Sequence, residues 1–150
     1  MRTKIYLLER YEYYGFDKAE KENIEKCYIL GYYDLKKELE KGIETCNRHG
    51  IKKDEIRVVP YTVNIRKGQK NIYILTYEYS LLNKNEEFID YEYIFAPKRS
   101  RRKCVQMKKK LKRIKKYSYS DKKIYVSKST EGYWISKYCL NKLYSVVDKY

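Results

Sequence analysis

The stretch from residue 56 to residue 96 reads IRVVPYTVNIRKGQKNIYILTYEYSLLNKNEEFIDYEYIFA. It contains three runs rich in β-branched and aromatic residues, at 56–65, 71–82 and 86–96. Short polar segments separate the runs, and the first of these segments holds Gly68. Apolar runs bounded by turn residues predict strands, and the short connections predict an antiparallel meander.

Alternation within these runs places one set of side chains on a common face of the expected sheet. The set is Val59, Tyr61, Val63, Tyr73, Leu75, Tyr77, Tyr79, Ile89, Tyr91, Tyr93 and Phe95. A shift of register by one residue would expose all of them, so the register is well specified. Pro60 lacks an N–H, which predicts an edge strand or a bulge. The tyrosines of this face suit either a sheet core or a stacking platform for bases, and the acidic residues nearby favour the core.

On the N-terminal side, residues 4–14 alternate and predict a strand, residues 15–25 are polar and predict a loop, and residues 26–33 predict a second strand. Asp34 is a good N-cap for the helix that follows. Gly50 supplies a stop for this helix. One apolar helical face is formed by Leu35, Leu39, Ile43 and Cys46.

Two segments of this region, IYLLERYEYY and YILGYYDLKKELEKGIE, resemble a loose pattern in small bacterial and phage proteins of uncharacterised domain families. In that pattern a strand of the form Y-L-L-E/H-x-Y-E-Y precedes a strand that ends in G-x-Y, and a helix follows. The resemblance covers residues 4–49. It implies a βα-type start and a mobile-element setting, and it assigns no functional residues.

On the C-terminal side, residues 97–116 read PKRSRRKCVQMKKKLKRIKK and contain twelve Lys or Arg and no acidic residue. The spacing of the apolar residues predicts a helix from about residue 101 to 116, with Ser100 as its N-cap. Its narrow apolar stripe is formed by Cys104, Met107, Leu111 and Ile114. The candidate binding residues are Lys98, Arg99, Arg101, Arg102, Lys103, Lys108, Lys109, Lys110, Lys112, Arg113, Lys115 and Lys116.

The charge is unevenly distributed along the 150 residues, whose formal net charge is +15. Residues 1–95 hold 17 basic and 17 acidic residues, whereas residues 96–150 hold 18 basic and three acidic residues. We therefore expect a single domain, 1–150, with a neutral sheet-rich half and a basic helical flank. Such an asymmetry indicates a polyanionic partner.

Residues 122–129 predict a short strand, and residues 130–150 predict a closing helix that Thr130 caps. The apolar face of this helix is formed by Ile135, Cys139, Leu143, Val146 and Tyr150, and Trp134 and Tyr138 widen it. The expected fold class is α+β, with a mainly antiparallel sheet of about five to six strands and two to three helices.

The patterns of common catalytic sites are missing: GxSxG, a Walker loop and GxGxxG do not occur. His49 ends a helix and suits a role at its dipole, and the four cysteines are too far apart for a zinc site and are expected to be free. Two-metal chemistry needs clustered carboxylates, for which the densest set is Glu86, Glu87, Asp90 and Glu92. We expect neither catalysis nor a cofactor or metal, with a metal-dependent nuclease at this cluster as one alternative.

The expected function is non-catalytic binding of nucleic acid, DNA or RNA, or of a nuclease ribonucleoprotein. In size and style the chain resembles phage and plasmid accessory proteins that inhibit host defence nucleases, including anti-CRISPR proteins. A stand-alone DNA- or RNA-binding regulator is the other alternative. A solvated helix face, an acidic protein partner and a membrane surface remain open as other readings of the basic segment, although its apolar stripe is narrow for a membrane. No run is long enough to cross a bilayer and residues 1–14 lack the uninterrupted apolar core of a secretion signal, so a cytoplasmic location is expected. The oligomeric state is left open.

Overall fold

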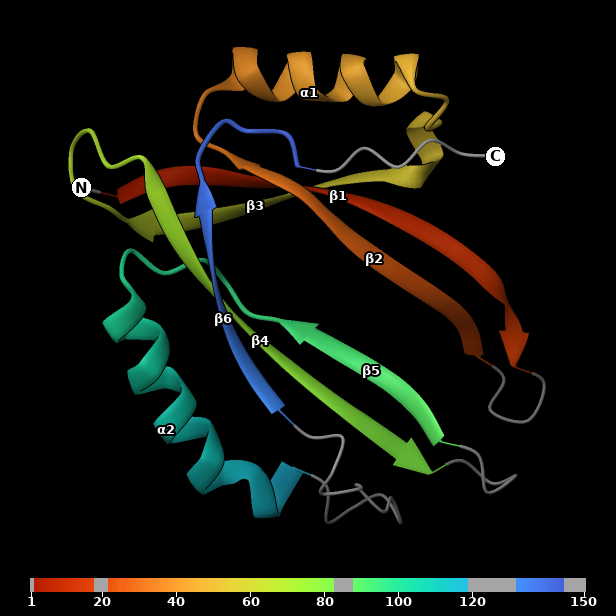
Figure 1. Ribbon diagram of the computed structural model, residues 1–150, viewed down its shortest axis with the longest axis vertical. Helices are drawn as coiled ribbons and strands as arrows, with labels where there is room; N and C mark the ends of the chain where they lie inside the picture. Colours follow the sequence, from red (N-terminus) through yellow and green to blue (C-terminus); the bar gives the residue numbers. More distant parts are fainter. Residues whose placement is uncertain (1, 18–21, 83–87, 119–131, 145–150) are drawn as a thin grey trace. The chain divides into compact units, whose positions relative to one another are not determined.

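The computed structural model describes residues 2–17, 22–82, 88–118 and 132–144, with side chains for 2–11, 27–78, 92–111 and 132–144. The elements, shown in Figure 1, are β1 (Arg2–Asp17), β2 (Glu22–Tyr33), α1 (Lys36–Arg48), the short 3-10 helix η1 (Lys53–Glu55), β3 (Ile56–Asn64), β4 (Asn71–Leu82), β5 (Phe88–Ile94), α2 (Arg101–Ser118) and β6 (Gly132–Cys139). Over the described residues the fold is α+β, with six antiparallel strands and two α-helices, which confirms the predicted class.

The chain divides into two compact units. The first comprises Met1–Asn71 and Tyr138–Tyr150, and the second comprises Ile72–Lys137. The first unit holds a sheet of order β2-β1-β3, and the second holds a sheet of order β5-β4-β6. This division differs from the change of charge at residue 96, because the basic helix α2 shares a unit with β4.

The predicted meander of three strands is wrong, because β3 pairs with β1 and not with β4. The β1–β3 register runs from Arg2↔Asn64 to Arg10↔Ile56. Strand β1 is the central strand of its sheet, and its adjacent residues Leu7 and Leu8, which point to opposite faces, are both buried. Burial on both faces is typical of a strand inside a sheet rather than at its edge, and β3 is the second neighbour of β1. The edge position of β3 confirms the placement expected from Pro60.

The predicted loop at 15–25 is largely strand. The hairpin of β1 and β2 continues until Asp17 pairs with Glu22, and only residues 18–21 lie outside the described part. The ladder is made by backbone N–H and C=O groups, so it extends through residues whose polar side chains suggested a loop.

Helix α1 confirms the predicted helix and covers one face of this sheet (Figure 1). The core between them is formed by Leu8, Leu30, Tyr33, Leu39, Cys46 and Ile51. The helix ends as expected at Gly50, whose φ of 85° is in the left-handed region. The N–H of Gly50 donates to the carbonyl of Asn47 (3.1 Å), and the N–H of Ile51 donates to that of Cys46 (3.1 Å). These are the two hydrogen bonds of a Schellman motif, and Ile51 completes it by packing into the core.

Adjacent tyrosines of β2 are buried on the two faces of the sheet. Burial raises the pKa of Tyr33 to about 12 and also raises that of Tyr32. Tyr33 lies against Gly42 of α1, where an added Cβ would be 2.7 Å from the tyrosine hydroxyl oxygen. Helix α1 therefore approaches β2 more closely at Gly42 than a larger residue would allow.

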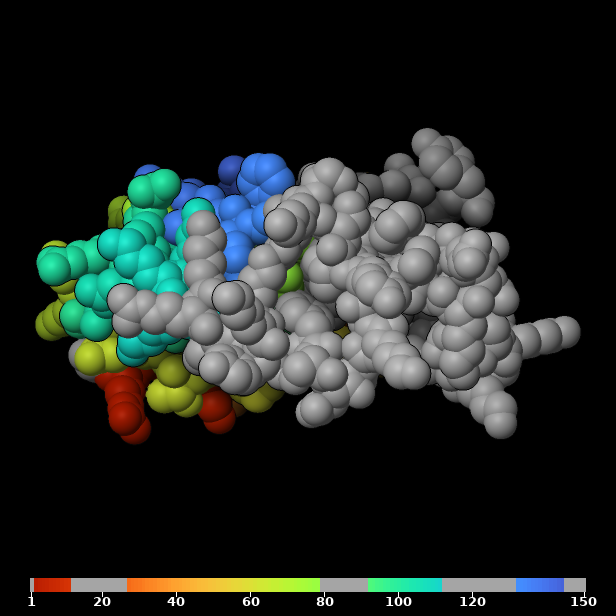
Figure 2. Space-filling model, turned by 90° about the horizontal axis from the view of Figure 1, so that it is seen from below, coloured from red at the N-terminus to blue at the C-terminus, as the bar shows by residue number. Residues whose placement is uncertain are grey.

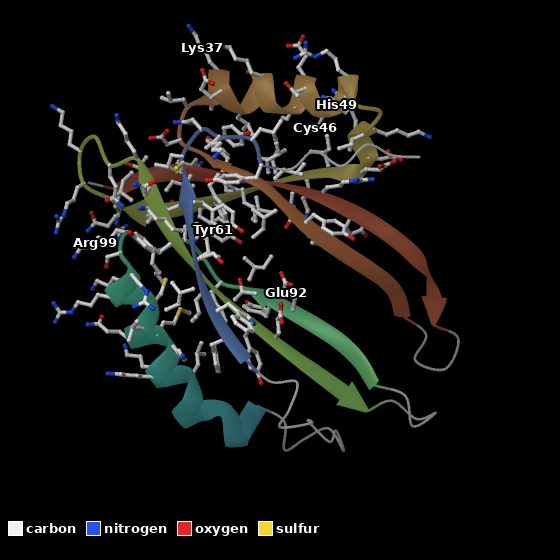
Figure 3. All side chains as sticks on the ribbon, viewed as in Figure 1. Lys37, Cys46, His49, Tyr61, Glu92 and Arg99 are labelled. Atoms are coloured by element: carbon white, nitrogen blue, oxygen red, sulfur yellow. The ribbon has the colours of Figure 1, made fainter. Side chains whose placement is uncertain are left out.

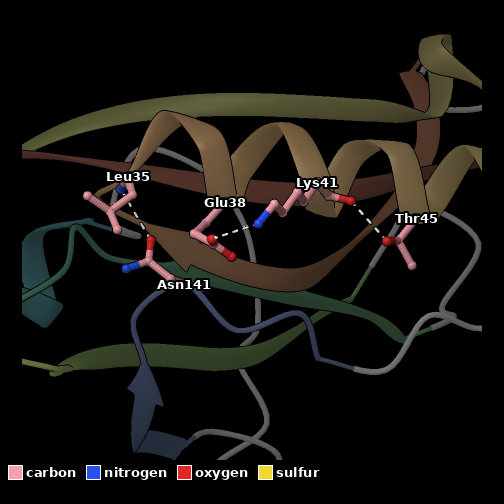
Figure 4. Close-up of polar contacts among 5 residues, drawn as sticks. All are labelled: Leu35, Glu38, Lys41, Thr45 and Asn141. Atoms are coloured by element: carbon pink, nitrogen blue, oxygen red, sulfur yellow. Dashed lines mark hydrogen bonds and ion pairs between the residues drawn. The ribbon is translucent and has the colours of Figure 1, made fainter.

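The N-terminus of α1 is held by a residue that is distant in sequence. Asp34 is not its N-cap, because Leu35 occupies that position and makes no side-chain capping bond. Instead the Asn141 carboxamide oxygen accepts the N–H groups of Asp34 (3.1 Å) and Leu35 (3.2 Å; Figure 4). Asn141 Nδ2 in turn donates to the Asp34 carboxylate (2.6 Å). The Asp34 side chain is thereby engaged with Asn141 rather than with the helix.

Replacing Asn141 by Ala is expected to destabilise the protein by about 2–3 kcal/mol, because three hydrogen bonds are lost and the residue sits at a φ of 61°. Replacing Asn141 by Gly removes the same bonds without the left-handed penalty, so it should cost about 1 kcal/mol less. Urea unfolding of the wild type, Asn141→Ala and Asn141→Gly measures the contribution of the hydrogen bonds and that of the left-handed backbone. Equal stability of wild type and Asn141→Ala would show that the bonds contribute nothing.

The predicted tyrosine face is divided between the two units, because Val59, Tyr61 and Val63 belong to β3 in the first unit, whereas its β4 and β5 members lie in the second. The β4–β5 register places Tyr77 opposite Tyr93 and Glu78 opposite Glu92, so tyrosines and acidic residues lie on separate faces as the alternation predicted. The predicted pairing of Glu78 with Asp90 and of Thr76 with Glu92 is wrong by two residues, because alternation fixes the face and not the partner. Tyr77 is buried and stacks on Tyr133 of β6, with ring centroids 4.6 Å apart, whereas Tyr93 on the edge strand is 57% exposed. The aromatic row is thus core at its centre and surface at its edge.

The predicted closing helix at 130–150 is wrong where it is described, because β6 occupies Gly132–Cys139. The four-residue spacing of its apolar residues is also typical of a helix, but the segment forms the second neighbour of β4, where Tyr133 stacks on Tyr77. Trp134, a member of the predicted apolar helix face, is 57% exposed. The expected strand at 122–129, Thr130, Val146 and Tyr150 lie outside the described residues.

Candidate nucleic-acid interface

Helix α2 begins where the sequence predicts. The N–H of Lys103 donates to Ser100 Oγ (3.3 Å), so Ser100 is the N-cap. Just before the helix, the backbone of Lys98 pairs with that of Tyr73 in β4 through two bonds of 2.8 and 2.9 Å. The start of α2 is therefore anchored to the sheet of its own unit.

The predicted apolar stripe faces inward over the described side chains. Cys104 is fully buried, and Met107 and Leu111 are half-buried. The pKa of the Cys104 thiol is raised, because the effect of burial outweighs the lowering by the nearby cations Lys98 and Arg101. The thiol therefore stays protonated at neutral pH and acts as a small apolar group.

The outer face of α2 is basic. Among the described side chains of the helix the exposed ones are Arg101, Arg102, Lys103, Gln106, Lys109 and Lys110. Arg102 and Lys109 are seven residues apart, as are Lys103 and Lys110, so each pair lies on one side of the helix about 10 Å apart along its axis. Figure 2 shows the described part of α2, in teal, at the molecular surface. We call Arg102, Lys103, Lys109 and Lys110 the α2 surface.

The remaining candidates have different positions. Arg99, which Figure 3 labels, is exposed before the helix. Lys98 and Lys108 are half-buried. The other four, Lys112, Arg113, Lys115 and Lys116, belong to α2, but their side chains lie outside the described part.

The carboxylates considered for a metal site are only partly described. Glu92 is exposed opposite Glu78, Asp90 pairs with Ser80 through the backbone, and Glu86 and Glu87 lie outside the described residues. Among the described residues, no three His, Cys, Asp or Glu side chains are grouped as a metal site requires. His49 is the C-cap residue of α1. All four cysteines are free: Cys46 and Cys104 are buried, Cys27 is half-buried and Cys139 is exposed.

A second group of exposed basic side chains, which was not predicted from the sequence, lies in the first unit. The group consists of Arg2, Lys4, Arg66, Lys67 and Lys70. The net charge of residues 1–95 is zero and gives no sign of this group, because the acidic residues that balance it lie in other segments. A usable signal was present: residues 2–8 and 56–77 contain no Asp or Glu.

No protein-family model matches the chain, and it matches neither a curated protein nor a solved structure. Within the described part of the chain, no helix has both the length and the apolar character needed to span a bilayer.

Proposed function

We propose that the chain is a non-catalytic binder of nucleic acid, alone or within a nucleoprotein, and that the α2 surface contacts the phosphate backbone. The observation that carries the proposal is a folded, anchored helix with four basic side chains on its outer face. These side chains lie in a segment, 93–120, that has no acidic residue.

The electrostatics of the helix support a bound anion over a purely solvating role. Arg102 and Lys103 lie in the first turn, where positive charge opposes the helix dipole, and that turn contains no acidic residue. Like charges along one face also repel each other. A mixture of acidic and basic side chains would solubilise the helix without the unfavourable dipole interaction and the repulsion. A phosphate bound against this face would offset both effects.

The residue types indicate how the contact is made. Lysine is a point charge that suits phosphate oxygens, whereas arginine offers bidentate geometry. Three of the four residues of the α2 surface are lysines. Backbone contact is therefore favoured over reading of base edges.

The salt dependence of binding tests the proposal. A labelled duplex DNA of about 20 base pairs and the corresponding RNA duplex are titrated by fluorescence anisotropy between about 50 and 200 mM salt. We expect the logarithm of the association constant to fall with the logarithm of salt concentration with a slope of roughly −4 or steeper, for five to eight phosphate contacts. No binding at about 50 mM salt, or a slope near zero, would contradict binding to free nucleic acid.

A second measurement separates free nucleic acid from nucleoprotein. The tagged chain is used to capture partners from host lysate, with and without nuclease treatment, and a purified nuclease ribonucleoprotein is compared with its naked guide RNA. A defence-nuclease inhibitor binds the ribonucleoprotein far more tightly than the RNA, whereas a regulator binds the two comparably.

A further inference from the structure

The loop between β3 and β4 is a structured turn in the first unit. The N–H of Gln69 donates to the carbonyl of Arg66 (3.0 Å), and Gln69 Oε1 accepts the N–H of Arg66 (3.0 Å). Gly68 adopts a φ of 76°, which closes the turn. The carbonyl of Lys70 accepts the N–H of Leu140 (2.7 Å), which ties the end of the turn to the C-terminal segment. Its backbone is therefore preorganised.

The start of β1 lies beside this turn. Arg2 pairs with Asn64, and Lys4 pairs with Thr62, so both lie opposite the last three residues of β3 before the turn. Directly opposite residues in an antiparallel pair have Cβ atoms about 5 Å apart. Figure 1 shows the start of β1 and the β3–β4 turn at the same end of their sheet. Arg2, Lys4, Arg66, Lys67 and Lys70, which we call the turn surface, are thus gathered from two chain segments.

The charge of the turn surface is not offset by its own segments. All five side chains are exposed, and residues 2–8 and 56–77 contain no acidic residue. The remaining basic residue of these segments, Arg57, behaves differently: its Nε donates to the buried carboxylate of Glu9, and its guanidinium lies 5.6 Å from the ring centroid of Tyr11. Structural pairing therefore accounts for Arg57 but not for the turn surface.

We propose that the turn surface is a second docking surface for a nucleic-acid phosphate backbone. The proposal rests on the function proposed above and adds a second contact region, outside the unit that holds α2. The occupant follows from charge complementarity, because five cations around one rigid turn match a row of phosphates better than a single anion. Anchoring of the turn backbone lowers the entropy cost of binding, because this backbone is already ordered in the free protein.

The test is a triple variant, Arg66→Glu, Lys67→Glu and Lys70→Glu, titrated with the same DNA and RNA duplexes. These side chains are exposed, and the hydrogen bonds of the turn use the backbone and Gln69, so the fold should persist. We expect affinity to fall roughly 10- to 100-fold and the salt slope to become shallower by about two to three units. Should the reversal unfold the protein, Arg66→Gln, Lys67→Gln and Lys70→Gln should show a smaller loss in the same direction.

The matched control changes three exposed lysines elsewhere in the same unit to Glu: Lys36 and Lys37 of α1, and Lys53 of η1. It makes the same change in net charge away from the turn. An equal loss of affinity in this control would overturn the turn surface, because net charge alone would then explain the effect. Wild-type affinity in the turn variant, with loss in a variant of the α2 surface, would overturn the turn surface and leave the proposed function intact. Failure of the wild type to bind the duplexes and the purified ribonucleoprotein alike would overturn both the turn surface and the proposed function.

Discussion

Changing Arg102, Lys103, Lys109 and Lys110 together to Glu is expected to lower the affinity for duplex nucleic acid at least about 100-fold at ~0.1 M salt. Each lost phosphate contact removes one released counterion, so the salt slope should become shallower by about three to four units. Reversal should act more strongly than neutralisation to Gln, because it adds repulsion to the lost attraction. Anisotropy titrations over a salt series measure both quantities.

The same substitutions should leave the fold intact or make it more stable. Acidic residues at positions 102 and 103 lie in the first turn of α2, where negative charge is favourable. A Glu at position 103 also completes a capping box with Ser100, whose Oγ already accepts the N–H of residue 103. Loss of binding and loss of structure are therefore predicted to be separable. Thermal unfolding should show a midpoint equal to or above that of the wild type.

A matched control reverses four exposed lysines of the first unit, Lys36, Lys37, Lys52 and Lys53. Its net charge equals that of the α2 variant, and it should keep most of the wild-type affinity. Lys108 is left out of the α2 variant because it is half-buried. If the α2 variant bound both duplexes and ribonucleoprotein as the wild type does, the proposed function would have to be abandoned.

Replacing Gly31 by Ala is expected to reduce the free energy of unfolding by about 3 kcal/mol. An added Cβ would lie 2.4 Å from the carbonyl oxygen of Lys142 and 3.0 Å from Cε2 of Tyr33. The neighbours of Gly31 hold the same C-terminal segment, since the Tyr32 carbonyl accepts from Asn141 (2.8 Å) and the Leu30 carbonyl from Tyr144 (2.6 Å). The methyl group therefore has to push away backbone that is hydrogen-bonded on both sides of it.

Gly132→Ala is the matched control, since Gly132 is also a strand glycine. There the nearest atoms to an added Cβ are those of the Trp134 ring at 3.7 Å, an ordinary contact. The free energy of unfolding of the Gly132→Ala protein should rise by less than about 1 kcal/mol, because Ala restricts the unfolded chain more than Gly does. Urea unfolding compares the two variants. A Gly31→Ala protein as stable as Gly132→Ala would show that the C-terminal segment yields easily at this point.

The elements that were predicted correctly depend on neighbours in sequence. The cap at Ser100 and the apolar stripe that begins at Cys104 are close together in sequence, and they predict α2. Gly50 ends α1 through hydrogen bonds that involve only the preceding turn. Alternation also assigned the residues of β4 and β5 to the correct faces, although it did not fix which residues pair. The spacing of apolar residues wrongly predicted a helix where β6 lies. A four-residue apolar spacing fits a helix or a strand when the neighbouring element is unknown.

The candidate site was predictable in part for the same reason. The basic face of α2 is continuous in sequence, so counting residues located it, although the count did not distinguish half-buried Lys108 from exposed Lys109. The turn surface combines residues 2–4 with 66–70, and no window along the chain contains both. It becomes visible once the β1–β3 register is known.

The amino-acid sequence alone was enough to establish the α+β class, most of the strands, both described helices, the stop of α1 at Gly50, the N-cap of α2 and the basic face of α2. These follow from backbone preferences and side-chain spacing over a few residues. The partner of β3, the extended conformation of β6 and the Asn141 bonds at the start of α1 depended on the folded chain. They join residues up to 107 positions apart, and burial of a shared core selects them from many pairings that local preference leaves equal.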